Sequence, residues 1–305
     1  MSTAAGALSS ARPDATTADA QLAASRTVRG GHSVWARMAR NPLTLVSFAF
    51  LVAIHLLVFI GPLAWTIAPQ QTSALDALLP PGPGHPLGTD DLGRDELSRL
   101  LHGSQVTLLV GFAAMLTATL LGLLVGATAG FYGGWTDALL MRLTDTLTAP
   151  AFFLIVTAVV VLGPSALTLI AVIGATSWMQ VARVIYAETL RFKTLDFVLA
   201  AEAMGARRAA VLYRHVLPQT FPSVVVSATL GVGFAILTES AVSYLGLGIQ
   251  PPTPSWGNML QNAQQYVWTA PALAIFPGAV ITLVVLAYNF LGDGLRDAVD
   301  PRLRI

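Results

Sequence analysis

Six long apolar stretches, separated by polar connections, constrain what this chain of 305 residues can fold into. Each stretch reaches the length of roughly 20 helical residues that crosses the hydrocarbon core of a membrane. Because lipid offers no hydrogen-bond partner to the backbone, we expect each stretch to be a helix. The predicted spans are residues 43–65, 106–131, 138–162, 166–186, 221–247 and 272–291.

The composition agrees with this pattern, since 54% of the residues are hydrophobic and only 11% are charged. A soluble domain of this size needs more charge on its surface. We therefore predict an all-α polytopic integral membrane protein. Cysteine is absent from the sequence, which excludes disulfides, thiol catalysis and thiolate metal sites in this chain.

The basic residues predict how the chain is oriented in the membrane. If the N-terminus lies inside, only Arg94 and Arg99 of the 17 lysines and arginines fall outside the cell. Because inside loops carry the excess of lysine and arginine, both termini are predicted to be cytoplasmic. The polar loop 191–220 is predicted to lie on the same side.

The expected organisation has four parts. Residues 1–34 are rich in Ala, Ser, Thr and Asp and lack an apolar core, so we expect a disordered cytoplasmic tail rather than a signal peptide. Residues 35–104 hold the first span and an external loop. Residues 105–295 form a five-helix core that includes the loop 191–220, and residues 296–305 form a cytoplasmic C-terminal tail.

The loop 191–220 has the pattern of helix, glycine turn and helix. Small residues at Ala200 and Ala201 allow another backbone to approach closely, and Gly205 permits a bend that a side chain would resist. Pro218 is expected to stop the second helix before the next span. A folded loop of this kind predicts a docking element, with an ordinary interhelical loop as the alternative.

The external loop carries the run His-Pro-Leu-Gly-Thr-Asp-Asp-Leu-Gly-Arg-Asp at residues 85–95. Its proline and glycines predict a turning backbone, and its charged residues can pair locally. Residues 96–102 predict a short amphipathic helix. A structural cap on the external face and a ligand site both stay open, and the spacing of His85 and the aspartates matches no metal motif.

Ionisable residues inside predicted spans need an explanation, because they are costly in lipid. Glu239 either lines a path for a solute or is satisfied by Thr238, Ser240 and a partner subunit. Asp145 is expected to pair with Arg142 one helical turn earlier. Further expectations are a kink at Pro150 and a packed histidine at position 55. Close helix approach is expected at four glycines of the second span, Gly111, Gly122, Gly126 and Gly130.

The loop 191–220 resembles the EAA loop of ABC importer permeases, the element that inserts into a cleft of a cytoplasmic ATPase. That family has Glu-Ala-Ala, three residues, Gly, nine residues, an apolar residue, any residue and Leu-Pro. Leu199 and His215 depart from the pattern, and the positions that match it are Ala200, Ala201, Gly205, Leu217 and Pro218.

Two external segments narrow the resemblance to the second permease subunit of dipeptide, oligopeptide and nickel importers. They are the run at residues 85–95, and residues 245–248 followed by Pro-Pro-Thr-Pro-Ser-Trp-Gly at residues 251–257. The resemblance implies the type I ABC importer permease fold, with six transmembrane helices and a cytoplasmic coupling loop. It also implies a transport subunit rather than an enzyme, in the cytoplasmic (inner) membrane of a bacterium.

The resemblance also implies site residues. Coupling to the ATPase is expected at Ala200, Ala201, Met204, Gly205, Ala206, Leu217 and Pro218. The substrate path is expected to include Glu239, Tyr244 and Trp256. The external motif is expected to rest on Gly88, Thr89, Asp90, Gly93, Arg94 and Asp95.

The expected partners follow from the same family. They are a sister permease that completes a heterodimeric pore, one or two cytoplasmic ATPases, an extracytoplasmic substrate-binding protein and membrane lipid, with no nucleic acid. The sequence has no Gly-rich loop ending in Gly-Lys-Ser or Gly-Lys-Thr, so ATP and Mg²⁺ are expected in the partner ATPase and no cofactor in this chain. The expected function is ATP-driven import of dipeptides or oligopeptides. The alternatives are import of nickel, glutathione or haem, an ion-coupled secondary transporter, and a membrane scaffold.

Overall fold

Helices account for almost all regular structure in the computed structural model, which describes residue 38 and residues 41–148 and 151–299. Five of these helices are long and apolar enough to cross a membrane, which confirms the prediction of an all-α polytopic membrane protein. They are α3 (Pro42–Ala64), α4 (Glu96–Tyr132), α7 (Ala166–Phe192), α10 (Leu217–Tyr244) and α12 (Ala272–Val299).

The prediction of a single third span at residues 138–162 is wrong. Two shorter helices occupy this stretch, α5 (Gly134–Thr148) and α6 (Ala151–Leu162). With 15 and 12 residues, neither has the length of about 20 residues that spans the hydrocarbon core. The kink predicted at Pro150 lies outside the described residues.

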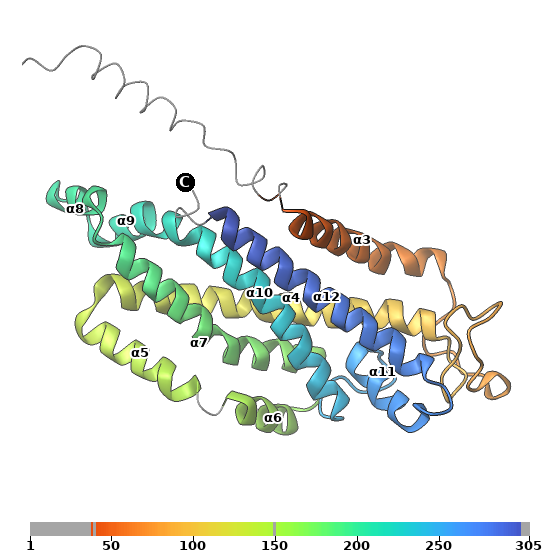
Figure 1. Cartoon of the computed structure of the whole chain (residues 1–305). Helices are drawn as coiled ribbons and strands as arrows, with labels where there is room; N and C mark the ends of the chain where they lie inside the picture. The colour runs from red at the N-terminus through yellow and green to blue at the C-terminus, as the bar shows by residue number, and fades with distance from the viewer. Residues whose placement is uncertain (1–37, 39–40, 149–150, 300–305) are drawn as a thin grey trace, which may run out of the picture.

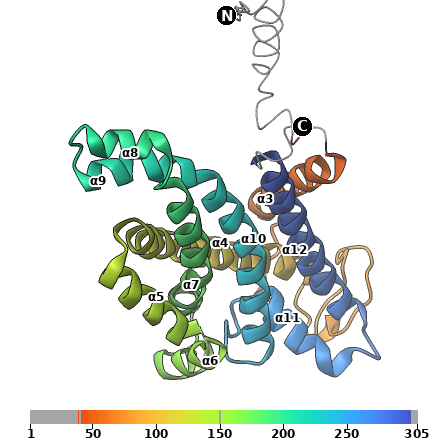
Figure 2. The ribbon, with the colours of Figure 1, turned by 60° about the vertical axis from the view of Figure 1, so that its left-hand side comes forward.

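The helix α4 lies at the centre of the bundle and packs along α7 over most of its length. The helix α10 contacts both, and α12 packs against α10. Figure 1 places the short helices α8 (Asp196–Ala203) and α9 (Arg208–Val211) at one end of the molecule. The short helix α11 (Trp256–Ala263) and the loop that follows α3 lie at the other end. Figure 2 shows α3 and the α5–α6 pair on opposite sides of the bundle.

Three glycines of α4 allow the close packing against α7. A Cβ atom added at Gly126 would overlap the backbone carbonyl oxygen of Ala182, and one added at Gly122 would lie 2.7 Å from the Cβ atom of Val181. At Gly130 the nearest atom, the Cβ of Thr189, would be 2.9 Å away. Close backbone approach through small residues is the usual way in which membrane helices associate, and the prediction made for these glycines is confirmed.

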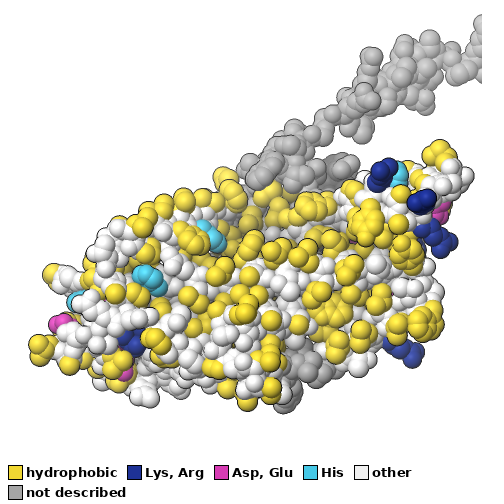
Figure 3. Space-filling view, turned by 180° about the vertical axis from the view of Figure 1, so that it is seen from behind, with side chains coloured by type: hydrophobic (Ala, Val, Ile, Leu, Met, Phe, Trp, Pro, Cys, Tyr) yellow, Lys and Arg dark blue, Asp and Glu magenta, His cyan; other side chains and the backbone are white. Residues whose placement is uncertain are grey.

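Charged side chains gather toward the two ends of the face seen in Figure 3, and hydrophobic side chains cover the region between. Large apolar residues are exposed along α3, among them Val46, Phe59 and Leu63. In water such a broad apolar surface would promote aggregation, whereas the hydrocarbon core of a membrane solvates it. The exposed surface therefore supports a multi-pass membrane protein.

Two ionisable residues that the sequence placed in spans, Asp145 and His55, have hydrogen-bond partners in the structure. Asp145 of α5 accepts a hydrogen bond from Arg183 of α7 at 2.8 Å, so the prediction that it pairs with Arg142 is wrong. The reason is that α5 lies against α7, which offers a cation directly opposite the carboxylate. His55 of α3 is half-buried and its Nδ1 donates to the carbonyl of Leu51 at 2.7 Å, as expected for a packed histidine.

We predict that Gly126→Ala lowers the stability of the protein by about 1–3 kcal/mol, because the new methyl group meets backbone that cannot rotate away. The matched control is Gly278→Ala in α12, where the nearest atom to an added Cβ is 3.8 Å away. Alanine is favoured over glycine in a helix by about 1 kcal/mol, so the control should be neutral or slightly stabilising. The fraction of protein that stays monodisperse after heating in detergent measures both. Equal behaviour of the two variants would contradict the packing argument.

Candidate functional site

A cavity of about 540 Å³ lies between α7 and α10, the two long helices that flank the polar loop. Such a volume falls in the range of small-molecule sites in proteins, roughly 300–1,000 Å³. The cavity also touches α4 and α6. It is lined by Met115, Ile155, Thr176, Ser177, Gln180, Val181, Val184, Ser227, Leu230, Gly231, Phe234 and Thr238.

The lining combines apolar side chains with neutral polar groups. Hydroxyl or amide groups come from Thr176, Ser177 and Gln180 on α7 and from Ser227 and Thr238 on α10. None of the described lining residues is charged. Groups of this kind can hydrogen-bond a polar solute within an apolar layer, where each unsatisfied polar group would otherwise be costly.

The residues predicted to line the substrate path lie elsewhere. Glu239 and Trp256 have no exposed surface in this structure, and neither borders the cavity. Tyr244 is 38% exposed at the C-terminal end of α10, also apart from the cavity. Sequence reasoning missed the polar lining of α7. The available signal was the group Thr176, Ser177 and Gln180, which interrupts an otherwise apolar span with neutral polar residues.

The loop 191–220 folds as a helix, a glycine turn and a helix, as predicted. The helix α8 ends in a Schellman motif, in which the N–H of Gly205 donates to Glu202 at 2.9 Å and the N–H of Ala206 donates to Ala201 at 3.1 Å. Gly205 has a φ of 84°, a left-handed conformation that favours glycine. No other atom would come within 4 Å of an added Cβ, so the turn faces open space.

The residues predicted for coupling divide into exposed and buried sets. Ala201 is buried together with Val198, so that side of α8 packs on the rest of the loop. Met204 is 82% exposed and Leu199 is 51% exposed. The other exposed residues of the predicted set are Ala200, Gly205, Ala206 and Pro218, and Leu217 is partly buried. The exposed residues form an accessible apolar surface at the end of the molecule.

The prediction that Pro218 stops the second helix is wrong. Helical structure continues from Arg208 to Tyr244, with a π turn at Leu212–Val216 in which the N–H of Leu217 donates to the carbonyl of Leu212. Proline lacks an N–H group, and a wider turn just before it accommodates that loss. Pro218 therefore lies in the first turn of α10. The end of the polar loop is continuous with a helix that lines the cavity.

Asp95 joins three segments at the opposite end of the molecule. As the N-cap of α4, its Oδ2 accepts from the N–H of Ser98 at 2.7 Å. The same oxygen accepts from the indole Nε1 of Trp65 at 2.7 Å, and Oδ1 accepts from Nδ1 of His85 at 2.8 Å. Asp95 has almost no exposed surface, so these bonds fix the end of α3, the external loop and the start of α4 together.

Asp90 closes the turn between these segments. Its Oδ1 accepts from the N–H groups of Leu92 and Arg94 at 3.0 and 2.9 Å, and its Oδ2 accepts from Nε of Arg94 at 2.6 Å. Arg99 of α4 approaches the same oxygen at 3.4 Å. These buried ion pairs have hydrogen-bonded partners, the condition under which buried charge is tolerated.

The remaining residues of the external motif shape its backbone. Gly88 and Gly93 have φ values of 83° and 67° and lie against the carbonyl groups of Leu79 and Ser73. Thr89 accepts from the N–H of Leu79 at 2.9 Å and donates to a backbone carbonyl of the same loop. All six predicted residues of the motif therefore take part in folding the external loop.

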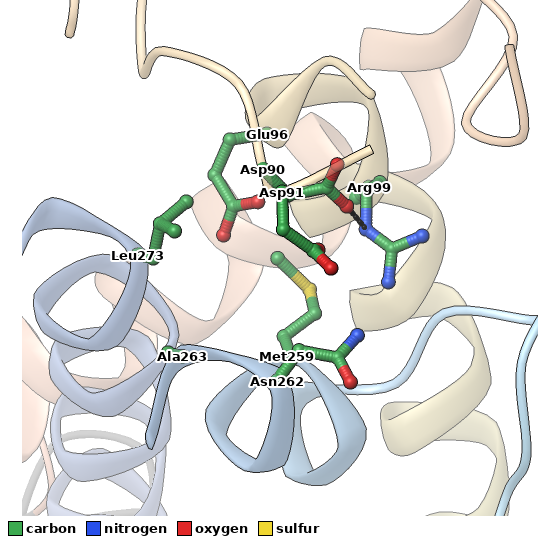
Figure 4. A pocket seen from close by; sticks show the side chains of 8 residues that line it. All are labelled: Asp90, Asp91, Glu96, Arg99, Met259, Asn262, Ala263 and Leu273. Carbon is green, nitrogen blue, oxygen red and sulfur yellow. Dashed lines mark ion pairs between the residues drawn. The ribbon is translucent and has the colours of Figure 1, made fainter. Parts of the chain in front are cut away.

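Figure 4 shows a small pocket between the external loop, α4, α11 and the start of α12. Its volume of about 10 Å³ holds roughly one water molecule. Arg99 points into it with an Nη1 that has no hydrogen-bond partner in the described part of the chain. The predicted separate helix at residues 96–102 is instead the first two turns of α4. The pocket is lined by Asp90, Asp91, Glu96, Arg99, Met259, Asn262, Ala263 and Leu273.

Comparison with protein families gives two matches. Residues 118–305 match the family described as "binding-protein-dependent transport system inner membrane component". Residues 31–81 match the family described as "N-terminal TM domain of oligopeptide transport permease C". Together they cover α3, the second part of α4 and everything that follows, including the polar loop, while residues 82–117 lie between the two matches.

Comparison with individual proteins gives the same assignment. The chain is 36% identical to the dipeptide transport system permease protein DppC of Alkalihalophilus pseudofirmus over 269 residues, 88% of each protein. It is 36% identical to the oligopeptide transport system permease protein OppC of Bacillus subtilis, again over 88% of each. It is 41% identical to the glutathione transport system permease protein GsiD of Pectobacterium atrosepticum, over 73% of this chain and 75% of the relative.

We predict that Asp95→Ala loosens the external loop, because it removes a helix cap and leaves two partly buried donors, Trp65 and His85, without this acceptor. The expected cost is about 2–5 kcal/mol. Hydrogen–deuterium exchange of peptides covering residues 70–95 should become more than tenfold faster. The control is Asp91→Ala, whose carboxylate approaches Arg94 only at 3.9 Å and is partly exposed, so its exchange should stay close to that of the wild type. Similar exchange in both variants would show that Asp95 does not hold the loop.

Proposed function

Because the chain belongs to the family of binding-protein-dependent transport system inner membrane components, we propose that the cavity between α7 and α10 is its half of a passage for peptides. The chain is a transmembrane permease subunit of an ATP-driven peptide importer, with the type I ABC permease fold. It is a transport component and not an enzyme. The observation that supports the proposed passage is a cavity of about 540 Å³ that lies between membrane-spanning helices and is lined in part by neutral polar groups.

The lining suits a peptide for a chemical reason. Each peptide bond carries a donor and an acceptor that must be satisfied when the solute leaves water. The hydroxyl of Ser227 can serve both needs, and the amide of Gln180 offers two donors and an acceptor. The hydroxyl of Thr238 donates to the carbonyl of Phe234 at 2.9 Å and can still accept a hydrogen bond from a solute. The passage can thus accommodate a peptide backbone without recognising one particular side chain.

A sister permease would complete this passage. At the cavity, α10 exposes the large apolar side chains of Phe234, which is part of the lining, and Leu237, which are 55% and 45% exposed. A second subunit of similar fold packed on this face would cover them and enclose the solute. The proposed pore is therefore heterodimeric, with the cavity near its centre.

The polar loop would dock on the ATPase. In the proposed orientation both termini and the α8–α9 pair face the cytoplasm of a bacterial cell, because this end carries most of the basic residues. The exposed side chains of Leu199 and Met204 offer an apolar contact beside Arg207 and Arg208. ATP and Mg²⁺ would bind to that partner, as one fused or two separate ATPase chains.

An extracytoplasmic substrate-binding protein would dock at the other end. Residues 248–269 contain no lysine, arginine, aspartate or glutamate, although they face outward in the proposed orientation. Trp268 is 94% exposed there, and aromatic residues are frequent at interfaces. The external loop fixed by Asp95 would provide a firm base beside this surface.

Dipeptides and oligopeptides are the proposed cargo, because DppC and OppC relatives match the chain over most of its length. Glutathione, itself a peptide, is the second candidate and rests on the GsiD relatives. The uncharged lining offers no specific support for nickel or haem.

The function is tested by uptake into proteoliposomes that contain this chain, its sister permease and the ATPase, supplied with the substrate-binding protein. Labelled dipeptide should accumulate only when ATP is supplied on the side of the membrane where the ATPase lies. Labelled glutathione, offered in the same assay, decides between the two cargoes. Uptake driven by a proton or sodium gradient without the ATPase would refute the importer and favour an ion-coupled transporter.

We predict that Gly205→Arg abolishes ATP-dependent uptake, because a long charged side chain at the exposed turn would block the contact with the ATPase. Gly84→Arg is the matched control, since Gly84 also has a positive φ and open surroundings but lies in the external loop. Both variants carry similar backbone strain, on the order of 1 kcal/mol. Uptake and co-purification of the ATPase are measured at equal expression. Normal uptake by Gly205→Arg would remove the loop from the mechanism.

We predict that Ser227→Trp blocks uptake while the complex still assembles and hydrolyses ATP, because the indole would fill part of the cavity. Leu283→Trp in α12 serves as the control, since Leu283 is 52% exposed and does not line the cavity. The same proteoliposome assay compares the two at equal ATPase activity. Undiminished uptake by Ser227→Trp would place the passage elsewhere.

A further inference from the structure

Glu239 is fully buried where α10 meets α4 and α11, although it belongs to a span. Its Oε1 accepts from the hydroxyl of Ser243 at 2.8 Å, and its Oε2 accepts from the hydroxyl of Ser240 at 3.3 Å. Thr107 on α4 and Ser255 before α11 are further hydroxyl-bearing residues near this carboxylate. The carboxylate thus accepts from two hydroxyl groups of its own helix, one of which, Ser243, also binds the segment before α11.

The same hydroxyl groups hold the start of α11. Ser243 accepts from the N–H of Ile249 at 3.0 Å while it donates to Glu239. Thr107 accepts from the N–H of Trp256 at 3.2 Å, and the Trp256 indole donates to Ser104 of α4 at 2.8 Å. The segment that leads into α11 is therefore bonded to the two helices on which it sits.

A second cap closes the other side of this segment. Ser255 and Asn258 form a reciprocal capping box at the N-terminus of α11. The amide of Asn258 also donates to the carbonyls of Ile249 and Thr253 at 3.1 and 2.8 Å. Close packing reinforces these bonds, since a Cβ atom added at Gly257 would overlap the backbone carbonyl of Ser240.

Burial excludes direct contact between Glu239 and a passing solute in this structure. The side chain has no exposed surface and does not line the cavity, whereas its neighbour Thr238 does. Consecutive residues of α10 therefore serve different sides of the helix. Thr238 faces the cavity, and Glu239 faces the base of α11.

We propose that Glu239 is a positioning residue that fixes α11 on α4 and α10, so that a partner docked on the external surface is aligned with the cavity. This inference rests on the proposed function, which places the substrate-binding protein at this end. A carboxylate is suited to the task because it can accept several hydrogen bonds at once. An apolar residue of similar size would leave the buried hydroxyls of Ser240 and Ser243 without this acceptor.

Spin labels test the positioning directly, and the absence of cysteine from the natural sequence makes the labelling specific. Labels at Gln264→Cys, just beyond α11, and Phe221→Cys, near the inner end of α10, report the distance between the two helices in the assembled complex. The tested variants are Glu239→Leu, Glu239→Gln and the milder Ser243→Ala. Thr229→Val is the control, because the Thr229 hydroxyl donates to the carbonyl of Val225 in the same helix at 2.8 Å.

The distance distribution should broaden in Glu239→Leu and, to a smaller extent, in Ser243→Ala. It should stay narrow in Thr229→Val and in Glu239→Gln, which keeps a carbonyl oxygen for Ser243. Narrow distributions in both Glu239→Leu and Ser243→Ala would overturn the proposal. Equal broadening in the Gln and Leu variants would also overturn it, because charge rather than hydrogen bonding would then be responsible.

The stimulation of ATP hydrolysis by the substrate-binding protein provides the functional readout. Glu239→Leu should reduce that stimulation by roughly fivefold or more, the range of coupling between two sites, while basal hydrolysis and assembly stay unchanged. Full stimulation of Glu239→Leu would refute the link to the cavity. If the wild-type complex itself shows no stimulation, the proposed function fails, whereas the distance measurement still decides whether Glu239 positions α11.

Discussion

Satisfying polar groups without water is the constraint on which this structure depends. It makes the spans helical, and it decides where their few polar side chains lie. Asp145 is paired with Arg183 across two helices, and Glu239 is surrounded by hydroxyl groups. The glycines of α4 allow close packing, since they bring α7 close enough for backbone atoms of the two helices to touch. Each polar site thus also ties helices together.

The two ends of the molecule differ in how firmly they are held. At the external end, buried carboxylates of Asp90 and Asp95 accept bonds from several segments and leave a compact loop. At the other end, α8 buries only Val198 and Ala201 and exposes most of its remaining surface. Covering exposed apolar residues such as Met204 with a partner surface is energetically favourable. A tightly bonded external loop and an exposed apolar surface on α8 fit the proposed function, in which the subunit receives a solute at one end and is driven from the other.

Much of the fold was predictable from the sequence, because lipid imposes a long apolar helix wherever the chain crosses it. Five spans and the helix-glycine-helix loop follow from apolar length and from Gly205. The division of the third span, the partner of Asp145 and the continuity through Pro218 were not predictable. These features depend on which helices become neighbours and on a π turn that no local pattern announces. The cavity was missed for the same reason, since Gln180 and Ser227 come to line one cavity only after the chain has folded.

The continuity of the helix through Pro218 bears on how a movement driven by ATP hydrolysis would be transmitted to the cavity. The helical path from Arg208 to Tyr244 joins the polar loop directly to the α10 side of the cavity. On the α7 side the connection is different, because Phe192 ends the helix and Lys193 donates from its Nζ to Gly130 of α4 at 2.7 Å. In the proposed function, a displacement of the α8–α9 pair would therefore move α10 more readily than α7, which α4 holds by close packing. Since the cavity lies between these two helices, unequal movement is sufficient to change its shape.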